Sequence, residues 1–100
     1  MNRYRIDIWD EAETELQEAA EWYEIRKEGL GADLLSEIDK TLDRVQDAPL
    51  RYPVIEPGVR RAIVSRFPFN LIFRVRDQTI EILAFFHQAK DPEQWKERRR

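Results

Sequence analysis

The hydrophobic pattern of the chain changes its period once, near the middle, and this change limits the fold more than any other feature. Over residues 11–28 and 34–45, apolar residues recur every three or four positions, which is the spacing of an amphipathic helix. From Val59 onward the sequence is rich in Val, Ile and Phe, in runs divided by Pro68 and by Asp77-Gln78, which is typical of strands. The chain therefore combines a helical first half with a β-rich second half.

The sequence predicts six elements in a fixed order. They are a strand over residues 4–8, helices over 11–28 and 34–47, and strands over 59–64, 70–76 and 79–87. Asp10 is predicted to cap the first helix, and Gly29 and Gly31 are predicted to end it. Because the links between the last strands are short, we expect these strands to be antiparallel. The predicted fold is α+β, in the order β-α-α-β-β-β, with a helical hairpin on one face of an antiparallel sheet and the other face open.

Length and composition predict one domain and exclude several kinds of site. One hundred residues form a small core, so we expect a single domain over residues 1–95 and a disordered tail over 96–100. The absence of cysteine excludes disulfides and thiolate metal sites, and a single histidine disfavours zinc, so we expect no metal and no cofactor. The sequence lacks a signal-peptide pattern and an apolar run of about 20 residues, so we expect a cytoplasmic protein without a membrane partner.

The positive charge is concentrated in the second half of the chain. Residues 1–58 contain 7 Lys/Arg and 15 Asp/Glu, a balance of −8, whereas residues 59–100 contain 10 and 5, a balance of +5. The same segment contains the only histidine, His87. We therefore expect any functional surface to lie between Val59 and Trp95.

The alternation of side chains along the strands assigns them to two faces. We place Leu71, Phe73 and Val75 in the core, and the alternate set on the open face (Asn70, Ile72, Arg74, Arg76). In the last strand we place the apolar set in the core (Ile80, Ile82, Ala84, Phe86) and the mixed set on the open face (Glu81, Leu83, Phe85, His87). The alternation leaves undecided whether Arg60 or Arg61 joins Arg74, and we favour Arg61.

The chain resembles the RelE/ParE superfamily of bacterial toxins over nearly its whole length. The resemblance is carried by the order of elements, the Arg60-Arg61 pair, the strand FPFNLIFRV and the ending ILAFFHQAKDPEQW, and the segments YRIDIWDEAETELQEAAEWYE and RYPVIEPGVRRA agree with it. The resemblance implies the toxin of a type II toxin–antitoxin, or plasmid stabilisation, system. It also implies a hetero-oligomer with a cognate antitoxin, whose extended segment wraps the toxin.

The superfamily includes two mechanisms, and the resemblance alone does not choose between them. RelE-like members cut messenger RNA on the ribosome, for which His87 would be the acid or base and Arg61 and Arg74 would clamp the phosphate. ParE-like members poison DNA gyrase. The chain lacks the lysine cluster and C-terminal tyrosine of RelE-like members, and its pI near 5.2 disfavours RNA binding. We therefore favour the gyrase inhibitor, whose ParE-like relatives are not known as hydrolases, and keep the mRNA endonuclease and a non-toxic interaction module as alternatives.

The predicted binding surface combines cations with the aromatic residues Phe85 and Trp95, which we expect to be exposed anchors. Its members are Arg60, Arg61, Arg66, Arg74, Arg76, Phe85, Lys90 and Trp95. The alternative interpretation is that these arginines only solvate an apolar sheet face with their long stems. Their clustering on neighbouring strands favours an anionic partner, because like charges crowded on one face repel each other.

Overall fold

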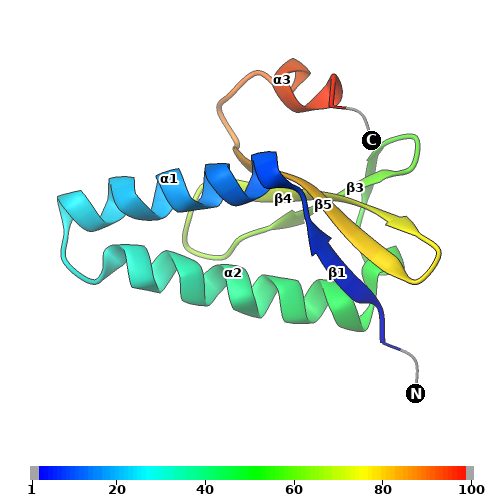
Figure 1. Cartoon of the computed structure of the whole chain (residues 1–100), viewed down its shortest axis with the longest axis horizontal. Helices are drawn as coiled ribbons and strands as arrows, with labels where there is room; N and C mark the ends of the chain where they lie inside the picture. Colours follow the sequence, from blue (N-terminus) through cyan, green and yellow to red (C-terminus); the bar gives the residue numbers. More distant parts are fainter. Residues whose placement is uncertain (1–2, 99–100) are drawn as a thin grey trace.

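A five-stranded sheet with the strand order β1-β5-β4-β3-β2 forms the centre of the molecule, and two long helices pack on one of its faces. The computed structural model describes residues 3–98. Its elements are β1 (Arg5–Ile8), α1 (Asp10–Arg26), α2 (Leu30–Asp47), η1 (Pro49–Arg51), β2 (Val54–Glu56), β3 (Val59–Ile63), β4 (Phe69–Arg76), β5 (Thr79–His87) and α3 (Glu93–Lys96). Figure 1 shows α1 and α2 side by side, with α3 apart from them near the C-terminus. The predicted α+β class and helical hairpin are confirmed.

The edges of the sheet differ from the prediction. Strands β3 to β5 are antiparallel as expected, but β1 pairs parallel with β5, with Ile6 opposite Ile80. A short link forces an antiparallel pair, whereas the two helices that follow β1 leave its direction free. The sequence also missed β2, a strand of three residues between Pro53 and Pro57 that is too short to show a period.

The turn between the helices depends on both glycines, though not in the predicted way. Helix α1 already ends at Arg26. Gly29 is the N-cap residue of α2, and its φ of 89° lies in the left-handed region that glycine adopts without strain. Gly31 lies inside α2, where a Cβ would lie 2.6 Å from the carbonyl oxygen of Ala20. Gly31 therefore permits close contact between the helices rather than ending one. Asp10 is the first helical residue and not the cap, and its charge suits the positive end of the helix dipole.

The core between the helices and the sheet is built from the predicted apolar residues. Leu16 of α1, Leu34 and Ile38 of α2, and Leu71 and Phe73 of β4 belong to one buried cluster. The assignment of β4 to two faces is therefore confirmed. No helix within residues 3–98 is long and apolar enough to cross a membrane.

The opposite face of the sheet is partly covered, which corrects the expectation of an open face. A second buried cluster lies there, composed of Trp9, Ile72, Leu83, Ala84, Phe86 and Trp95. Trp95 belongs to α3, a helix of four residues that the sequence pattern did not predict. The prediction that Trp95 is exposed is wrong, because only 4% of its surface remains accessible.

A β-bulge at Leu83 of β5 reverses the predicted faces of Ala84, Phe85 and Phe86. Phe73 lies opposite Ile82 and the adjacent Ile72 lies opposite Ala84, so Leu83 is the extra residue. Leu83 and Ala84 consequently join the second cluster, and Phe85 turns into the core beneath the helices. The face assignments of Ala84, Phe85 and Phe86 and the predicted exposure of Phe85 are therefore wrong, whereas His87, at the end of the strand, lines hollows on both faces of the sheet.

Side chains from both ends of the chain bind the backbone groups at this bulge. The Phe85 amide donates to Glu15 Oε1 at 3.1 Å, and Arg98 Nη1 donates to the Leu83 carbonyl at 2.7 Å. Arg98 and Glu15 also form an ion pair, with Nη2 2.6 Å from Oε2. Lys96 pairs with Glu56 at 3.4 Å. The expected disorder of residues 96–100 therefore does not hold for Lys96 and Arg98, while residues 99 and 100 lie outside the described part.

Candidate functional site

A pocket of about 260 Å³ lies between the helix-free face of the sheet and the C-terminal segment. We call it the sheet pocket. It is lined by Ile55, Arg61, Asn70, Ile72, Phe86, His87, Gln88, Lys90, Pro92, Trp95 and Lys96. Strands β2 to β5, the segment after β5 and α3 all contribute, so the pocket combines an apolar floor with several nitrogen-bearing side chains. Four of the predicted site residues meet here, namely Arg61, His87, Lys90 and Trp95.

Arg61 points to the helix-free face because it lies opposite Ile72, a member of the second cluster. The preference for Arg61 over Arg60 is thereby confirmed. Its Nε is buried and has no hydrogen-bond acceptor, and within residues 3–98 its guanidinium forms no ion pair. A buried donor without an acceptor is costly, by about 1–3 kcal/mol. Arg61 is therefore an uncompensated cation that can bind an anionic group of a partner.

Arg74 lies on the same face but is already neutralised. Its Nε lies 2.6 Å from Glu81 Oε1, and its guanidinium carbon lies 5.1 Å above the Trp9 ring. Arg76 approaches the same carboxylate oxygen at 3.7 Å. Arg74 is not among the residues that line the sheet pocket, so the two arginines predicted to clamp a phosphate do not share it.

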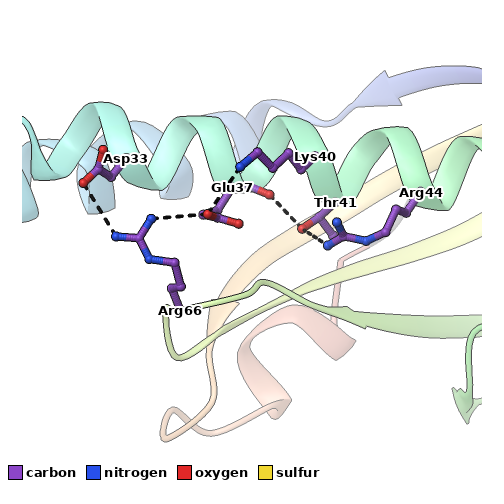
Figure 2. Close-up of polar contacts among 6 residues, drawn as sticks. All are labelled: Asp33, Glu37, Lys40, Thr41, Arg44 and Arg66. Carbon is purple, nitrogen blue, oxygen red and sulfur yellow. Dashed lines mark hydrogen bonds and ion pairs between the residues drawn. The ribbon is translucent and has the colours of Figure 1, made fainter.

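Arg60 and Arg66 point away from the sheet pocket. Arg60 lies opposite Phe73, and its Nη1 donates to the Tyr52 carbonyl at 2.6 Å and the Leu50 carbonyl at 3.1 Å. Arg66 lies in the β3–β4 loop at φ of 72° and reaches α2, where it pairs with Glu37 at 3.3 Å and Asp33 at 3.7 Å (Figure 2). Both arginines stabilise loops, which agrees with the structural interpretation more than with binding.

The carboxylate of Glu37 is the centre of the cluster in Figure 2 and one of the two buried polar side chains of the described chain. Lys40 approaches it at 3.7 Å, in addition to Arg66. One turn further, the Thr41 hydroxyl donates to the Glu37 carbonyl at 2.8 Å and accepts a bond from Arg44 at 3.3 Å. The cluster therefore ties the β3–β4 loop to α2 and is satisfied internally.

His87 lies at the end of β5, with its ring edge-on to Phe69 at 5.1 Å between centroids. Its Nδ1 accepts a hydrogen bond from the Ala89 amide at 3.0 Å. An Nδ1 that accepts a bond is unprotonated, so the neutral ring carries its proton on Nε2. His87 is thus prepared to donate a hydrogen bond through Nε2, and its Nδ1 lone pair is not free to accept a proton from a substrate.

A larger hollow of about 390 Å³ lies on the other side of β5, against α1. It is lined mainly by aromatic residues, among them Trp22, Tyr23, Phe69 and Phe85, and His87 borders it as well. Glu15, Glu18 and Lys90 also line this hollow, and the Glu15 carboxylate there is paired with Arg98. It lacks Arg61 and the other arginines of the predicted binding surface.

The sheet pocket also contains three residues that sequence reasoning missed, which are Asn70, Gln88 and Lys96. Asn70 was placed on the correct face, but nothing in its pattern distinguished it from a solvent-facing strand residue. The Glu56 carboxylate raises the pKa of Lys96 through a hydrogen bond and its charge, so this lysine is already paired. Among residues 3–98, no group of three or more His, Asp or Glu residues is arranged to bind a metal ion.

Comparison with known proteins places this geometry in a family. Residues 6–92 match the model of the ParE toxin of the type II toxin–antitoxin system parDE. Among curated proteins, none matches the sequence significantly.

Solved structures share the fold. A chain of the chromosomal ParDE toxin–antitoxin system from P. aeruginosa superimposes with a TM-score of 0.75 at 22% identity, over 84% of this chain and 95% of that chain. A doubly substituted variant of the E. coli toxin RelE in the free state superimposes with a TM-score of 0.69 at 17% identity, over 95% of this chain and 93% of that chain. At such identities the likeness shows the fold alone.

Proposed function

Because the chain belongs to the ParE toxin family of type II toxin–antitoxin systems, we propose that it inhibits DNA gyrase when it is not bound by its antitoxin. The chain is the toxin component of such a system, and its partner is an antitoxin. Gyrase as the target, the cytoplasm as the place of action and a hetero-oligomeric resting complex belong to the proposal. The surface that binds the target would be the sheet pocket, with Arg61 and Lys90 as its cations.

The observation that supports inhibition over RNA cleavage is the state of the three predicted catalytic groups. Arg74 is paired with Glu81, Nδ1 of His87 is engaged by the Ala89 amide, and Arg61 cannot serve as a base because arginine stays protonated. Cleavage through the RNA 2′-hydroxyl needs a proton acceptor as well as phosphate clamps. A surface with cations but without a free base favours binding.

The test is to incubate the purified chain, freed of antitoxin, with gyrase and supercoiled DNA, and separately with translating ribosomes. We expect blocked supercoiling or trapped cleaved DNA in the first reaction and intact message in the second. The Arg61→Gln/Lys90→Gln variant should inhibit gyrase less, while Lys27→Gln at the distant helical turn removes one exposed charge as a control. An inactive chain in the gyrase reaction would refute the proposal.

The RelE-like nuclease is the second candidate, because Arg61, His87 and Lys90 do line one pocket. Cleaved message in the ribosome reaction, lost in a His87→Ala variant that folds normally, would establish it in place of gyrase inhibition. Expression of the chain alone tests the remaining alternative. Unaffected growth of a suitable host would favour a non-toxic interaction module.

A further inference from the structure

We propose that the sheet pocket binds a single carboxylate side chain of the antitoxin, with Arg61 as its principal ligand, and that an aliphatic residue beside that carboxylate covers Ile63. This inference rests on the assignment of the chain as the toxin of a toxin–antitoxin pair. It deepens the proposed function by naming the chemical group that would occupy the pocket in the neutralised complex.

The first argument compares the hydrogen-bond acceptors and ion pairs of the five arginines of the predicted binding surface. Four of them already have acceptors, as described above: Arg60 binds backbone carbonyls, Arg66 binds two carboxylates of α2, and Arg74 and Arg76 share Glu81. Only Arg61 has neither an acceptor nor an ion pair within the described chain. A guanidinium in this state is suited to bidentate binding of a carboxylate.

The second argument is the small number of free charges in the sheet pocket. Lys96 is paired with Glu56 and Glu93, whereas Lys90 forms no ion pair with any residue between 3 and 98. The uncompensated cations are therefore Arg61 and Lys90. His87 adds an Nε2 donor when neutral. Two cations and one neutral donor match one anionic group, whereas a nucleic acid strand brings a phosphate at every nucleotide and depends on several basic contacts.

The third argument is the apolar surface around these cations. Ile55, Ile72, Phe86 and Trp95 are the large apolar residues of the pocket wall. Ile63 follows Arg61 by two positions along β3, so it lies on the same face, and 57% of its surface is exposed. Asn70, which lines the pocket, is the register partner of Ile63. A partner with an aliphatic side chain next to its carboxylate would fill both the charged and the apolar part.

The direct readout is the Nε–H resonance of Arg61 in a ¹⁵N spectrum of the full chain, identified by its loss in Arg61→Lys. The probe is the peptide acetyl-Ile-Glu-Leu-amide, and its matched control is acetyl-Ile-Gln-Leu-amide. Inorganic phosphate and hexauridylate RNA are titrated in parallel. We expect the glutamate peptide to shift the Arg61 resonance saturably and to bind about tenfold or more tightly than the glutamine peptide, the discrimination typical of a charge-assisted hydrogen bond.

Variants separate the role of Arg61 from general electrostatics. Arg61→Gln should lower the affinity for the glutamate peptide about tenfold or more. Arg61→Lys keeps the charge but loses the planar guanidinium, so it should lower this affinity less. Lys27→Gln, which removes one exposed charge elsewhere, should leave the affinity unchanged. Should Arg61→Gln fail to fold, as judged by its thermal transition, the comparison of Arg61→Lys with the wild type decides the matter.

Three results would overturn the inference. They are equal affinity for the glutamate and glutamine peptides, a shift of the Arg61 resonance by phosphate or RNA at lower concentrations than by the glutamate peptide, and equal losses in Arg61→Gln and Lys27→Gln. The outcome is separable from that of the proposed function. Discrimination between the peptides without gyrase inhibition would refute only the gyrase proposal, and gyrase inhibition without that discrimination would refute only the carboxylate site.

Discussion

Removal of the Arg98 guanidinium tests whether the C-terminal segment is fastened to the β5 bulge. Nη1 and Nη2 of Arg98 donate to the two carboxylate oxygens of Glu15 at 3.1 and 2.6 Å, and Nη1 also donates to the Leu83 carbonyl at 2.7 Å. The two charged side chains are only 14% and 23% exposed, so water screens this pair less than a surface pair. Arg98→Ala removes all three hydrogen bonds at once.

The expected loss follows from these contacts. A fully exposed ion pair contributes about 0–1 kcal/mol, whereas breaking a buried pair costs about 3–5 kcal/mol. The partly buried Arg98 pair lies between these limits, and the entropy regained by the freed tail offsets part of the loss. We therefore expect Arg98→Ala to lower the free energy of unfolding by about 2 kcal/mol. For a domain of this size, the melting temperature would fall by roughly 8–16 °C.

Urea unfolding of the wild type, Arg98→Ala, Glu15→Ala and the double variant measures the pair as a thermodynamic cycle. We expect a coupling free energy of at least about 1 kcal/mol. Arg51→Ala removes an exposed arginine at η1 and should change stability by less than about 0.5 kcal/mol. If Arg98→Ala is as stable as Arg51→Ala, or if the two substitutions of the pair are additive, the reasoning about this contact is wrong.

Three further predictions concern the two helices and the β3–β4 loop. Gly31→Ala should lower the free energy of unfolding by about 2 kcal/mol, because the added Cβ meets the Ala20 carbonyl at 2.6 Å; a neutral effect in urea unfolding would contradict this contact. Arg66→Gly should be more stable than Arg66→Ala by about 1 kcal/mol, since both lose the ion pairs in Figure 2 but only glycine relieves the left-handed φ of 72°; the reverse order of melting temperatures would refute this strain. Hydrogen bonds from the Gly29 and Gly31 amides lower the pKa of Glu24 in the folded chain below its usual 4.5. The ionised Glu24 carboxylate therefore stabilises the folded state fully above pH 4.5, and this stabilisation is lost as the pH falls through the lower pKa of the folded state. The stability difference between wild type and Glu24→Gln should therefore shrink below pH 4.5, and a difference independent of pH would exclude this linkage.

The elements that sequence reasoning predicted well are those with a long, regular hydrophobic pattern. The boundaries of β4 and β5 differ from the prediction by at most one residue, and α2 ends at Asp47 before Pro49 as expected. The elements it missed have three or four residues, namely η1, β2 and α3. Segments of this length complete no period, and tertiary contacts such as the burial of Trp95 stabilise them instead.

The face assignments show how one inserted residue defeats an otherwise correct pattern. Alternation along β5 was valid up to Ile82, where Leu83 forms the bulge and reverses the parity of the residues directly after it. Because the strand period is two, one extra residue moves Phe85 from the predicted open face into the core. No local feature of ILAFFH marks the bulge, which depends on Glu15 and Arg98 binding its backbone groups.

The sequence by itself determined the α+β class, the helical hairpin, the concentration of cations after Val59 and the family. These features follow from periodicity, composition and the order of motifs, which can be read along the chain without knowing which distant residues meet. Only the tertiary structure decided which cations remain free for a partner. Glu81 neutralises Arg74 across a strand pair and Glu37 holds Arg66 from 29 positions away, while Arg61 is left without an acceptor in the described chain. Whether a charge is compensated depends on the distance to its partner in space, and no linear pattern contains that distance.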